Sequence, residues 1–254
     1  MEKIYFMKIA LITGATSGIG KATAKKLAKE FKLILCGRRI DQLRELEKEL
    51  SQLTEVTTLC FDVRKKEEVF SAIDKLPDNF KTIDILINNA GNAHGLASFQ
   101  DADLEDLEAM IFGNTMGIIY VTKAILPLLS KNSGHILNIS SIAGKEVYPN
   151  GTTYCASKFA VEALSKGMRM DLLNDGIKIT NIAPGLVETE FSMVRFKGDA
   201  ERSESVYSGY EPLKPEDIAE TIYFALTQPD HVQLADITIL PKAQASPTQV
   251  LKNI

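Results

Sequence analysis

The sequence predicts a single α/β domain built on a doubly wound, seven-stranded parallel sheet. Apolar, β-rich runs alternate with longer amphipathic segments from end to end, and no repeat or Pro/Gly-rich linker interrupts them. The apolar runs are nearly continuous, as in parallel strands that are covered on both faces by helices in right-handed crossovers. The 254 residues suit one large domain, which needs no disulfide or metal to stabilise its core.

Seven strands and six helices are expected. The strands are placed at 9–13, 33–37, 57–62, 83–87, 135–139, 178–182 and 236–239, and the helices at 18–30, 41–53, 66–76, 103–130, 152–174 and 215–227. In the second helix Leu43, Leu46 and Leu50 recur at steps of three and four, the spacing of one helix face. The stretch 187–212 shows no clear strand. It follows the sixth strand at the carboxyl edge of the sheet, so we expect a substrate lid there.

Composition and charge exclude several classes of protein. A net charge of -4 gives no basic excess for nucleic acid. Cys36, Cys60 and Cys155 are widely spaced and form no ligand cluster with histidines, so we expect mostly buried thiols and no metal site. No apolar run approaches the roughly 20 residues that span a bilayer, and no signal-peptide core is present. We therefore expect a cytoplasmic protein without a membrane partner, for which Met7 is an alternative start.

A glycine-rich turn joins the first strand to the first helix. It reads Thr13-Gly14-Ala15-Thr16-Ser17-Gly18-Ile19-Gly20, with the spacing Gly-x-x-x-Gly-x-Gly. Glycines permit a tight turn and the close approach of a phosphate, while the helix N-terminus offers free N–H groups and a positive dipole. An ordinary strand–helix turn can also contain three glycines. Their position between an apolar strand and an amphipathic helix predicts a dinucleotide-binding site.

The end of the second strand predicts NADP(H) as the cofactor. It reads Cys36-Gly37-Arg38-Arg39, with glycine where NAD-binding units carry an acidic residue for the ribose 2′-hydroxyl. Guanidinium groups bind a 2′-phosphate through charge-assisted, bidentate hydrogen bonds. The alternative is that Arg38 and Arg39 are two solvated arginines at a helix start.

A tyrosine and a lysine four residues apart begin the fifth helix. Tyr154 and Lys158 share one helix face. A phenol titrates near 10, so a tyrosine base needs its anion stabilised, and a nearby ammonium does this by charge attraction. Taken alone, such a pair is usually a packed phenol beside a surface lysine.

The ordered set of motifs resembles the classical short-chain dehydrogenase/reductase family over essentially the whole chain. The matching residues are Gly14, Gly18 and Gly20, Asp62, Asn88-Asn89-Ala90-Gly91, Asn114, Ser141, Tyr154 with Lys158, and Pro184-Gly185-Leu186-Val187-Glu188-Thr189. The step of 13 residues from Ser141 to Tyr154 is also that of the family. The resemblance implies a Rossmann-type fold, a nicotinamide cofactor and a small-molecule substrate.

The resemblance also implies residue roles. Ser141 would hydrogen-bond the substrate oxygen, Tyr154 would transfer the proton, and Lys158 would lower the pKa of Tyr154 and hold the nicotinamide ribose. Asn114 would anchor a water that links Lys158 to solvent. The expected cofactor contacts are Gly14, Thr16, Ser17, Gly18, Ile19, Gly20, Arg38, Arg39, Asp62, Val63, Asn89, Ala90, Gly91, Tyr154, Lys158, Pro184, Gly185, Val187 and Thr189. Ser140 adjoins Ser141, but the spacing favours Ser141.

The segment 184–199 is similar to NADP-dependent 3-hydroxy acid dehydrogenases of that family, which oxidise serine, L-allo-threonine and related acids. The Arg38-Arg39 pair and the run Leu213-Lys214-Pro215-Glu216-Asp217-Ile218 support this similarity, whereas Glu188 stands where the bacterial enzymes have glycine. A carboxylate substrate needs a cation in an otherwise apolar pocket, for which Arg195 is preferred over Lys197 because of its bidentate fork. Tyr148 is a further candidate for the substrate pocket. Both cations are alternatively solvated lid residues.

Two other functions remain open. One keeps the chemistry but acts on uncharged aldehydes or ketones, since specificity is set by the lid and not by the fold. The other is a non-catalytic NADP-binding regulator, which would be expected to lose Ser141, Tyr154 or Lys158. The resemblance implies a homotetramer built on the helices at 103–130 and 152–174. The role of the tail 242–254 stays open, and covering the active-site edge of a neighbouring subunit is one option.

Overall fold

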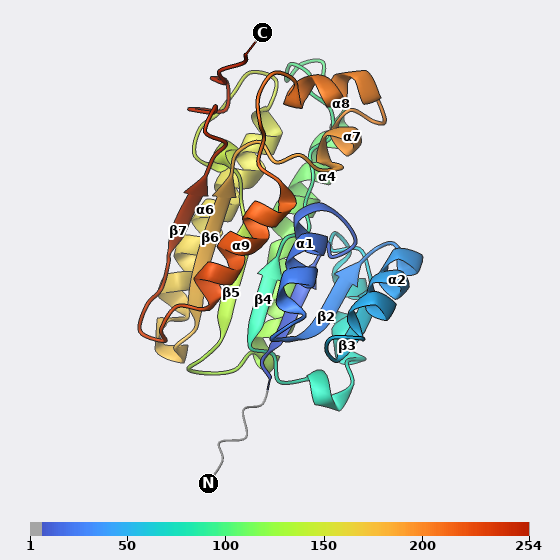
Figure 1. The fold of residues 1–254 in the computed structure, drawn as a ribbon, viewed down its shortest axis with the longest axis vertical. Helices are drawn as coiled ribbons and strands as arrows, with labels where there is room; N and C mark the ends of the chain where they lie inside the picture. Colours follow the sequence, from blue (N-terminus) through green and yellow to red (C-terminus); the bar gives the residue numbers. More distant parts are fainter. Residues whose placement is uncertain (1–6, 254) are drawn as a thin grey trace.

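Seven parallel strands form the centre of the computed structural model, which describes residues 7–253. The strand order is β3-β2-β1-β4-β5-β6-β7, so the chain runs outward in one direction from β1 and then in the other (Figure 1). The strands are β1 Ile9–Thr13, β2 Lys32–Gly37, β3 Val56–Cys60, β4 Ile85–Asn88, β5 His135–Ile139, β6 Lys178–Pro184 and β7 Asp236–Ile239. The predicted doubly wound sheet is confirmed. Of the two candidate starts, Met1 lies outside the described residues.

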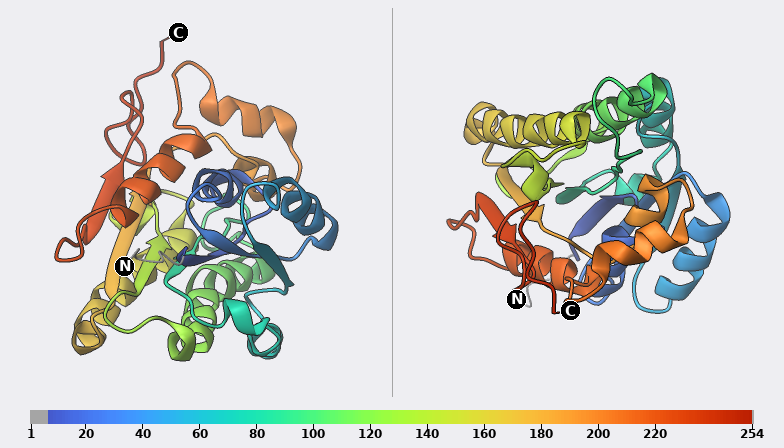
Figure 2. Two further views of the ribbon diagram at one scale, coloured as in Figure 1. Left: turned by 60° about the horizontal axis from the view of Figure 1, so that its bottom comes forward. Right: turned by 90° about the horizontal axis from the view of Figure 1, so that it is seen from above.

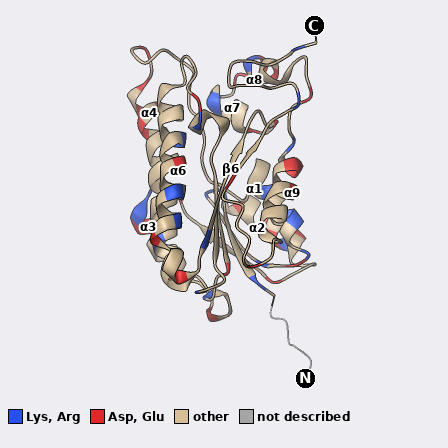
Figure 3. Cartoon of the chain, turned by 90° about the vertical axis from the view of Figure 1, so that its left-hand side faces the viewer, with Lys and Arg blue, Asp and Glu red and all other residues tan. Residues whose placement is uncertain are grey.

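Helices cover both faces of the sheet (Figure 3). One face carries α1 Gly18–Leu27, α2 Ile40–Leu50 and α9 Pro215–Leu226. The other carries α3 Lys66–Asp74, α4 Leu104–Ile111, α5 Gly117–Ile125 and α6 Thr152–Asp171. Two short helices, α7 Phe191–Arg195 and α8 Ala200–Tyr207, lie with the C-terminal tail beyond the carboxyl ends of the strands (Figures 1 and 2).

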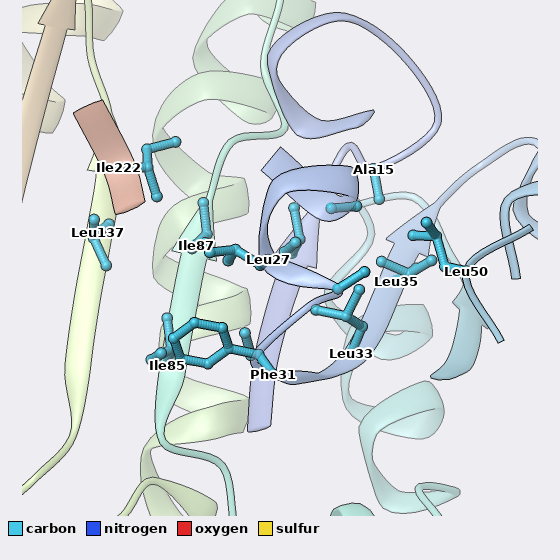
Figure 4. Packing of buried hydrophobic residues seen from close by; sticks show 14 of the residues in the cluster. Ala15, Leu27, Phe31, Leu33, Leu35, Leu50, Ile85, Ile87, Leu137 and Ile222 are labelled. Carbon is cyan, nitrogen blue, oxygen red and sulfur yellow. The ribbon is translucent and has the colours of Figure 1, made fainter. Parts of the chain in front are cut away.

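Alternate side chains of each central strand fill the two cores. Ile12 of β1 faces α1 and α9 in a cluster with Leu35 and Ile87, part of which is shown in Figure 4. Leu11 faces α3 and α5, together with Leu86 of β4. All five of these side chains are fully buried. Because a strand residue alternates between faces, only a continuous apolar run supplies both cores, which explains the runs seen in the sequence.

The helix expected at 103–130 is interrupted. The residues Phe112–Met116 form a π-helical turn between α4 and α5, and Leu126–Leu128 form a 3₁₀ turn after α5. Pro127 lacks a backbone N–H and clashes with the preceding turn, which ends the regular helix. A π turn is rare and occurs often at functional sites. It places Asn114 in the interior, where the residue is only 1% exposed.

Other boundaries also differ from the predicted ones: α1, α2 and α6 each end three residues earlier than predicted, and β6 extends to Pro184. β3 ends at Cys60, which leaves Asp62 beyond the strand, and β4 begins at Ile85, with Ile83 forming only an isolated bridge. The stretch 187–212, expected to be irregular, contains α7 and α8, and Asp199 caps α8 by accepting from the N–H of Arg202. The lid is therefore partly helical.

The segment Leu104–Leu128 is long and apolar enough to cross a membrane by length and composition, contrary to the expectation that no run approaches this length. Half of its most apolar window is buried inside the fold. Val121 and Ile125 of α5 pack in the core beneath the sheet, so a core helix accounts for the apolar composition.

Candidate active site

The glycine-rich turn forms a cradle with space for a phosphate. Gly14 and Gly18 have positive φ angles of 65° and 49°, which favour glycine. A Cβ on Gly20 would lie 2.2 Å from the carbonyl oxygen of Gly14, so this position tolerates no side chain. The helix α1 begins at Gly18 with no acidic residue in its first turn, and its positive end therefore faces the turn uncompensated. This geometry fits a pyrophosphate.

The segment after β4 is bound to the back of that turn. The side-chain amide of Asn89 donates to the carbonyl oxygens of Thr13 at 2.9 Å and of Gly14 at 3.2 Å. The backbone N–H groups of Asn89 and Ala90 both donate to the Thr13 hydroxyl at 3.0 Å. Asn89 therefore holds the two central strand ends together, as expected where the winding of the sheet reverses.

The two arginines after β2 occupy different surroundings. Arg39 donates to the hydroxyls of Thr16 at 3.0 Å and Ser17 at 2.8 Å, and it pairs with Glu190 of the lid at 3.4 Å. These contacts place its guanidinium at the glycine-rich turn, where a 2′-phosphate would gain charge-assisted hydrogen bonds.

Arg38 lies 3.6 Å from the carboxylate of Asp62, which also accepts a bidentate pair of bonds from Arg64, Nε to Oδ1 at 3.1 Å and Nη2 to Oδ2 at 2.6 Å. Burial of Asp62 opposes its ionisation, but the hydrogen bonds and charge of Arg64 outweigh burial and hold its pKa below the usual range. Arg64 lines the cavity and was not predicted from the sequence. Its proximity in sequence to Asp62 was the available signal.

Ser141, Tyr154 and Lys158 meet at the carboxyl end of β5. Ser141 caps the 3₁₀ turn Ile142–Gly144, and its hydroxyl accepts from the N–H of Ala143 at 3.1 Å. Tyr154 and Lys158 lie on the first turns of α6, and the Lys158 ammonium is 5.9 Å from the centre of the Tyr154 ring. The ammonium donates to the carbonyl oxygen of Ile139 at 2.9 Å. The hydroxyl of the neighbouring Ser140 instead donates to the backbone carbonyl of Lys158 at 3.4 Å.

Burial dominates the titration of both groups on α6. It raises the pKa of Tyr154 well above the usual value, and the Ser141 hydroxyl and the charge of Arg195 offset only part of this rise. Burial lowers the pKa of Lys158 to about 8, against the opposing charge of Glu162. Lys158 is not among the groups that shift the pKa of Tyr154 in this structure, and the lowering expected from Lys158 stays a prediction.

Asn114 is fixed by the backbone of a neighbouring loop. Its side-chain oxygen accepts from the N–H of Asn92 at 2.8 Å, and its amide donates to the Asn92 carbonyl at 2.8 Å and to the Ser157 hydroxyl at 2.9 Å. A Cβ on Gly91 would lie 2.7 Å from the Asn114 oxygen and 3.8 Å from the Lys158 ammonium. The π turn thus places Asn114 next to Lys158. A water link between them stays a prediction.

Arg195 ends the lid helix α7 and faces the tyrosines. It donates to the Tyr148 hydroxyl at 3.0 Å and to the Gly95 carbonyl at 3.3 Å, and its guanidinium carbon is 5.8 Å from the centre of the Tyr154 ring. Lys197 instead pairs with Asp106 at 2.8 Å, and its side chain is 58% exposed. Of the two cations considered for a carboxylate, Arg195 is the one brought to the site.

One cavity of about 580 Å³ joins these groups. This volume is in the range of cofactor and substrate sites. Of the predicted site residues, Gly20 and Asn114 lie behind its wall, and the others line it. The lining also includes residues that were not predicted, among them Phe191, Tyr207 and Gln244. Thr189 lies against Gly18, and Tyr207 donates to the carbonyl of Val187 at 2.9 Å, so the lid closes over the glycine-rich turn.

The C-terminal tail forms part of the same wall. The Gln244 side-chain oxygen accepts from the N–H of Leu186 at 2.9 Å and occupies the space beside Gly185. Farther along, the N–H of Asn253 donates to the carbonyl of Gly209 at 2.8 Å, after α8. The tail therefore packs on the active-site edge of its own chain. Contact with a neighbouring subunit stays a prediction.

Neither a metal centre nor a disulfide lies beside this site in the part of the chain that the structure describes. Within residues 7–253, no group of three or more His, Cys, Asp or Glu side chains is arranged to hold a metal ion. Cys36 and Cys155 are buried and Cys60 is exposed, and all three are free thiols. This agrees with the expectation of mostly buried thiols.

Comparisons with known proteins agree with this geometry. The family model described as short chain dehydrogenase matches residues 8–200. An NADP-dependent 3-hydroxy acid dehydrogenase of Schizosaccharomyces pombe is 44% identical over 250 residues, 96% of each chain. A sulfoacetaldehyde reductase of Chromohalobacter salexigens is 43% identical over 240 residues, 93% of this chain and 95% of the relative. A serine 3-dehydrogenase of Agrobacterium fabrum is 40% identical over 236 residues, 92% of this chain and 94% of the relative.

A solved structure shares the whole architecture. The closed form of a serine dehydrogenase complexed with NADP+ superposes with a TM-score of 0.90 at 38% identity, covering 97% of this chain and all of that one. The glycine cradle, the Ser141–Tyr154–Lys158 group and these matches lead to one conclusion: the chain belongs to the short-chain dehydrogenase family of oxidoreductases.

Proposed function

We propose that this chain transfers a hydride between NADP(H) and a short 3-hydroxy acid of the serine, allo-threonine or 3-hydroxyisobutyrate type. The observation that carries the proposal is Arg195, a cation held 5.8 Å from the ring of Tyr154 at one end of the cavity. An acid whose carboxylate binds Arg195 brings its hydroxyl toward Ser141 and Tyr154. The named relatives support this class. In serine, in a 3-hydroxy acid and in sulfoacetaldehyde, a single carbon atom separates the acidic group from the carbon that reacts.

The residues present fit NADP(H). The cradle of Gly14, Gly18 and Gly20 leaves the space and the free N–H groups that a pyrophosphate needs. Arg38 and Arg39 supply cations for a 2′-phosphate, and Asp62 and Val63 line the part of the cavity proposed for the adenine. Lys158 would hold the nicotinamide ribose, and Val187 and Thr189 would meet the carboxamide. The bound nicotinamide supplies the hydride acceptor or donor.

The chain's own residues manage the proton and the developing charge. In the oxidation, Tyr154 takes the hydroxyl proton as the carbon loses its hydride, and the product is a carbonyl. Ser141 donates a hydrogen bond to the substrate oxygen while its charge changes. Because burial raises the pKa of Tyr154, the phenol holds its proton in this structure, ready for the reverse reduction. Oxidation requires the charge of Lys158 to favour the phenolate.

A homotetramer and a cytoplasmic location belong to the same proposal. Phe112 beside α4, and Phe159 and Met170 on α6, are exposed apolar side chains on the helices considered for subunit contacts. Burying them between copies would remove apolar surface from water. Free thiols are typical of a reducing compartment, which supports the proposed location.

The function is tested by following the absorbance of reduced cofactor with NADP+ or NAD+ and a panel of alcohols. The panel contains L-serine, D- and L-allo-threonine, 3-hydroxyisobutyrate, 3-hydroxypropionate, simple secondary alcohols and a steroid. We expect NADP+-dependent turnover of the acids, reduced by at least about 100-fold in Tyr154→Phe, since a positioned acid/base contributes on that order. Turnover of uncharged alcohols alone would favour the general carbonyl reductase. Cofactor binding without any turnover would favour the non-catalytic regulator.

A further inference from the structure

A cluster of charges around the buried Glu162 lies on the catalytic helix, outside the cavity. The Lys145 ammonium donates to the carboxylates of Glu162 at 3.0 Å and Asp236 at 2.8 Å. The amide of Asn181 donates to the second oxygen of Glu162 at 2.7 Å. The Glu162 side chain is only 8% exposed. A buried carboxylate is costly unless it is paired and hydrogen-bonded, and here both of its oxygens have partners.

The cluster connects the elements that carry the reacting groups. Glu162 lies four residues after Lys158 on α6, so the two side chains share one helix face. Lys145 directly follows the 3₁₀ turn that Ser141 caps, and its N–H donates to the carbonyl of Ile142. The turn is pressed against α6, because a Cβ on Gly144 would lie 2.7 Å from the carbonyl oxygen of Lys158.

Two carboxylates, Glu162 and Asp236, face the single ammonium of Lys145. The Asp236 side chain is 35% exposed and that of Glu162 is 8% exposed, so water screens the charge of Asp236 more strongly. The groups that face Lys158 are Tyr154 and Glu162 from α6, the Ile139 carbonyl from β5, Gly91 after β4, and Asn114 from the π turn. Among these groups, Glu162 is the one that carries a carboxylate charge.

We propose that the charge of Glu162 favours the ammonium form of Lys158 from one helical turn away, and that the pair of Glu162 with Lys145 ties the Ser141 turn to the helix of Tyr154 and Lys158. Glu162 is thus a positioning residue that acts through Lys158 and touches neither substrate nor cofactor. Burial lowers the pKa of Lys158, and the negative charge of Glu162 offsets part of this lowering. Glu162 therefore helps to keep the Lys158 side chain charged beside the phenol of Tyr154. The catalytic part of this inference rests on the proposed function, whereas the charge state of Lys158 does not.

The test measures the titration of Lys158 directly, without turnover. The cofactor-free protein is labelled with limiting acetic anhydride between about pH 6 and 10.5, the range around the usual lysine value. Acetylation of Lys158, which lines the cavity, is read by mass spectrometry. Wild type is expected to reach half-labelling near pH 8, the pKa that burial imposes on Lys158. In Glu162→Gln, half-labelling should move down by about one pH unit, because one nearby negative charge is lost.

Two variants separate this electrostatic role from a structural one. Asp236→Asn removes the same charge from the same cluster but on the edge strand β7, and its half-labelling should stay within about 0.3 unit of wild type. Lys145→Gln leaves both carboxylates without their ammonium, and half-labelling should move upward. This opposite sign keeps the proposal testable if Glu162→Gln folds poorly. An unchanged Lys158 titration in Glu162→Gln, or equal shifts in Glu162→Gln and Asp236→Asn, would overturn the proposal.

Activity then reports on the catalytic part of the inference. With any substrate that the enzyme oxidises, the alkaline limb of the kcat profile should move with the labelling curve in each variant. A shift in labelling without any turnover would refute the proposed function and leave the electrostatic role of Glu162 intact. Turnover without a shift in labelling would support the proposed function and refute the electrostatic role of Glu162.

Discussion

Replacing Arg195 with methionine should weaken the binding of 3-hydroxy acids without abolishing the chemistry. Methionine keeps an unbranched side chain over the Tyr148 ring, which lies 5.6 Å from the guanidinium carbon, but removes the charge. A hydrogen bond to a charged group contributes about 1.5–3 kcal/mol. At about 1.4 kcal/mol for each factor of ten, KM should rise about 10- to 150-fold. The change in kcat should be smaller, because the lost contact is made in the ground state as well.

The assay compares steady-state kinetics on an acid and on an uncharged alcohol of similar size. Lys197→Met is the matched control, since this lid cation pairs with Asp106 on the surface and should leave KM within about twofold. An equal loss by Arg195→Met on charged and uncharged substrates would refute the reasoning. Arg195 would then act by fastening the lid through its bond to Gly95 and not by binding the carboxylate.

Two further predictions concern the cofactor and the fold. Arg39→Ala should weaken NADP+ binding by about 10- to 100-fold in calorimetry, because the variant loses a cation that binds the 2′-phosphate. Binding of NAD+, which lacks that phosphate, should be nearly unchanged. The control is Arg44→Ala, since the Arg44 side chain on α2 is 70% exposed. Burial lowers the pKa of His135 to about 3, so below about 6.5 the unfolded chain takes up a proton that the folded chain refuses. Between pH 7.5 and 5, the free energy of unfolding should therefore fall by about 2 kcal/mol less in His135→Gln than in wild type, as measured by urea unfolding. An equal fall in both proteins would contradict this prediction.

Local patterns in the sequence predict those elements whose structure is determined by the residues of one short segment. The glycines of the phosphate turn, the Arg38-Arg39 pair and the apolar strands fall where they were expected, because each depends on the conformation or chemistry of a short segment. The spacing of Tyr154 and Lys158 likewise fixes a shared helix face before any tertiary contact is known.

Features that depend on distant contacts were not predictable in this way. The π turn at Asn114 is specified by its fit against Asn92 and Ser157, which lie 22 and 43 residues away. The two lid helices form in a polar stretch with little apolar periodicity, where tertiary contacts such as that of Tyr207 with Val187 decide the structure. The raised pKa of Tyr154 follows from its burial, which no sequence pattern reports.

The position of Gln244 separates the wall of the cavity from the cradle of the coenzyme. The Gln244 oxygen accepts from the N–H of Leu186 and fills the space beside Gly185, whereas the cradle is formed by the glycine-rich turn and the segment after β4. A change near residue 244 would therefore open the cavity and leave the phosphate cradle in place. Such a change would shorten the residence time of a bound ligand before it disturbed folding.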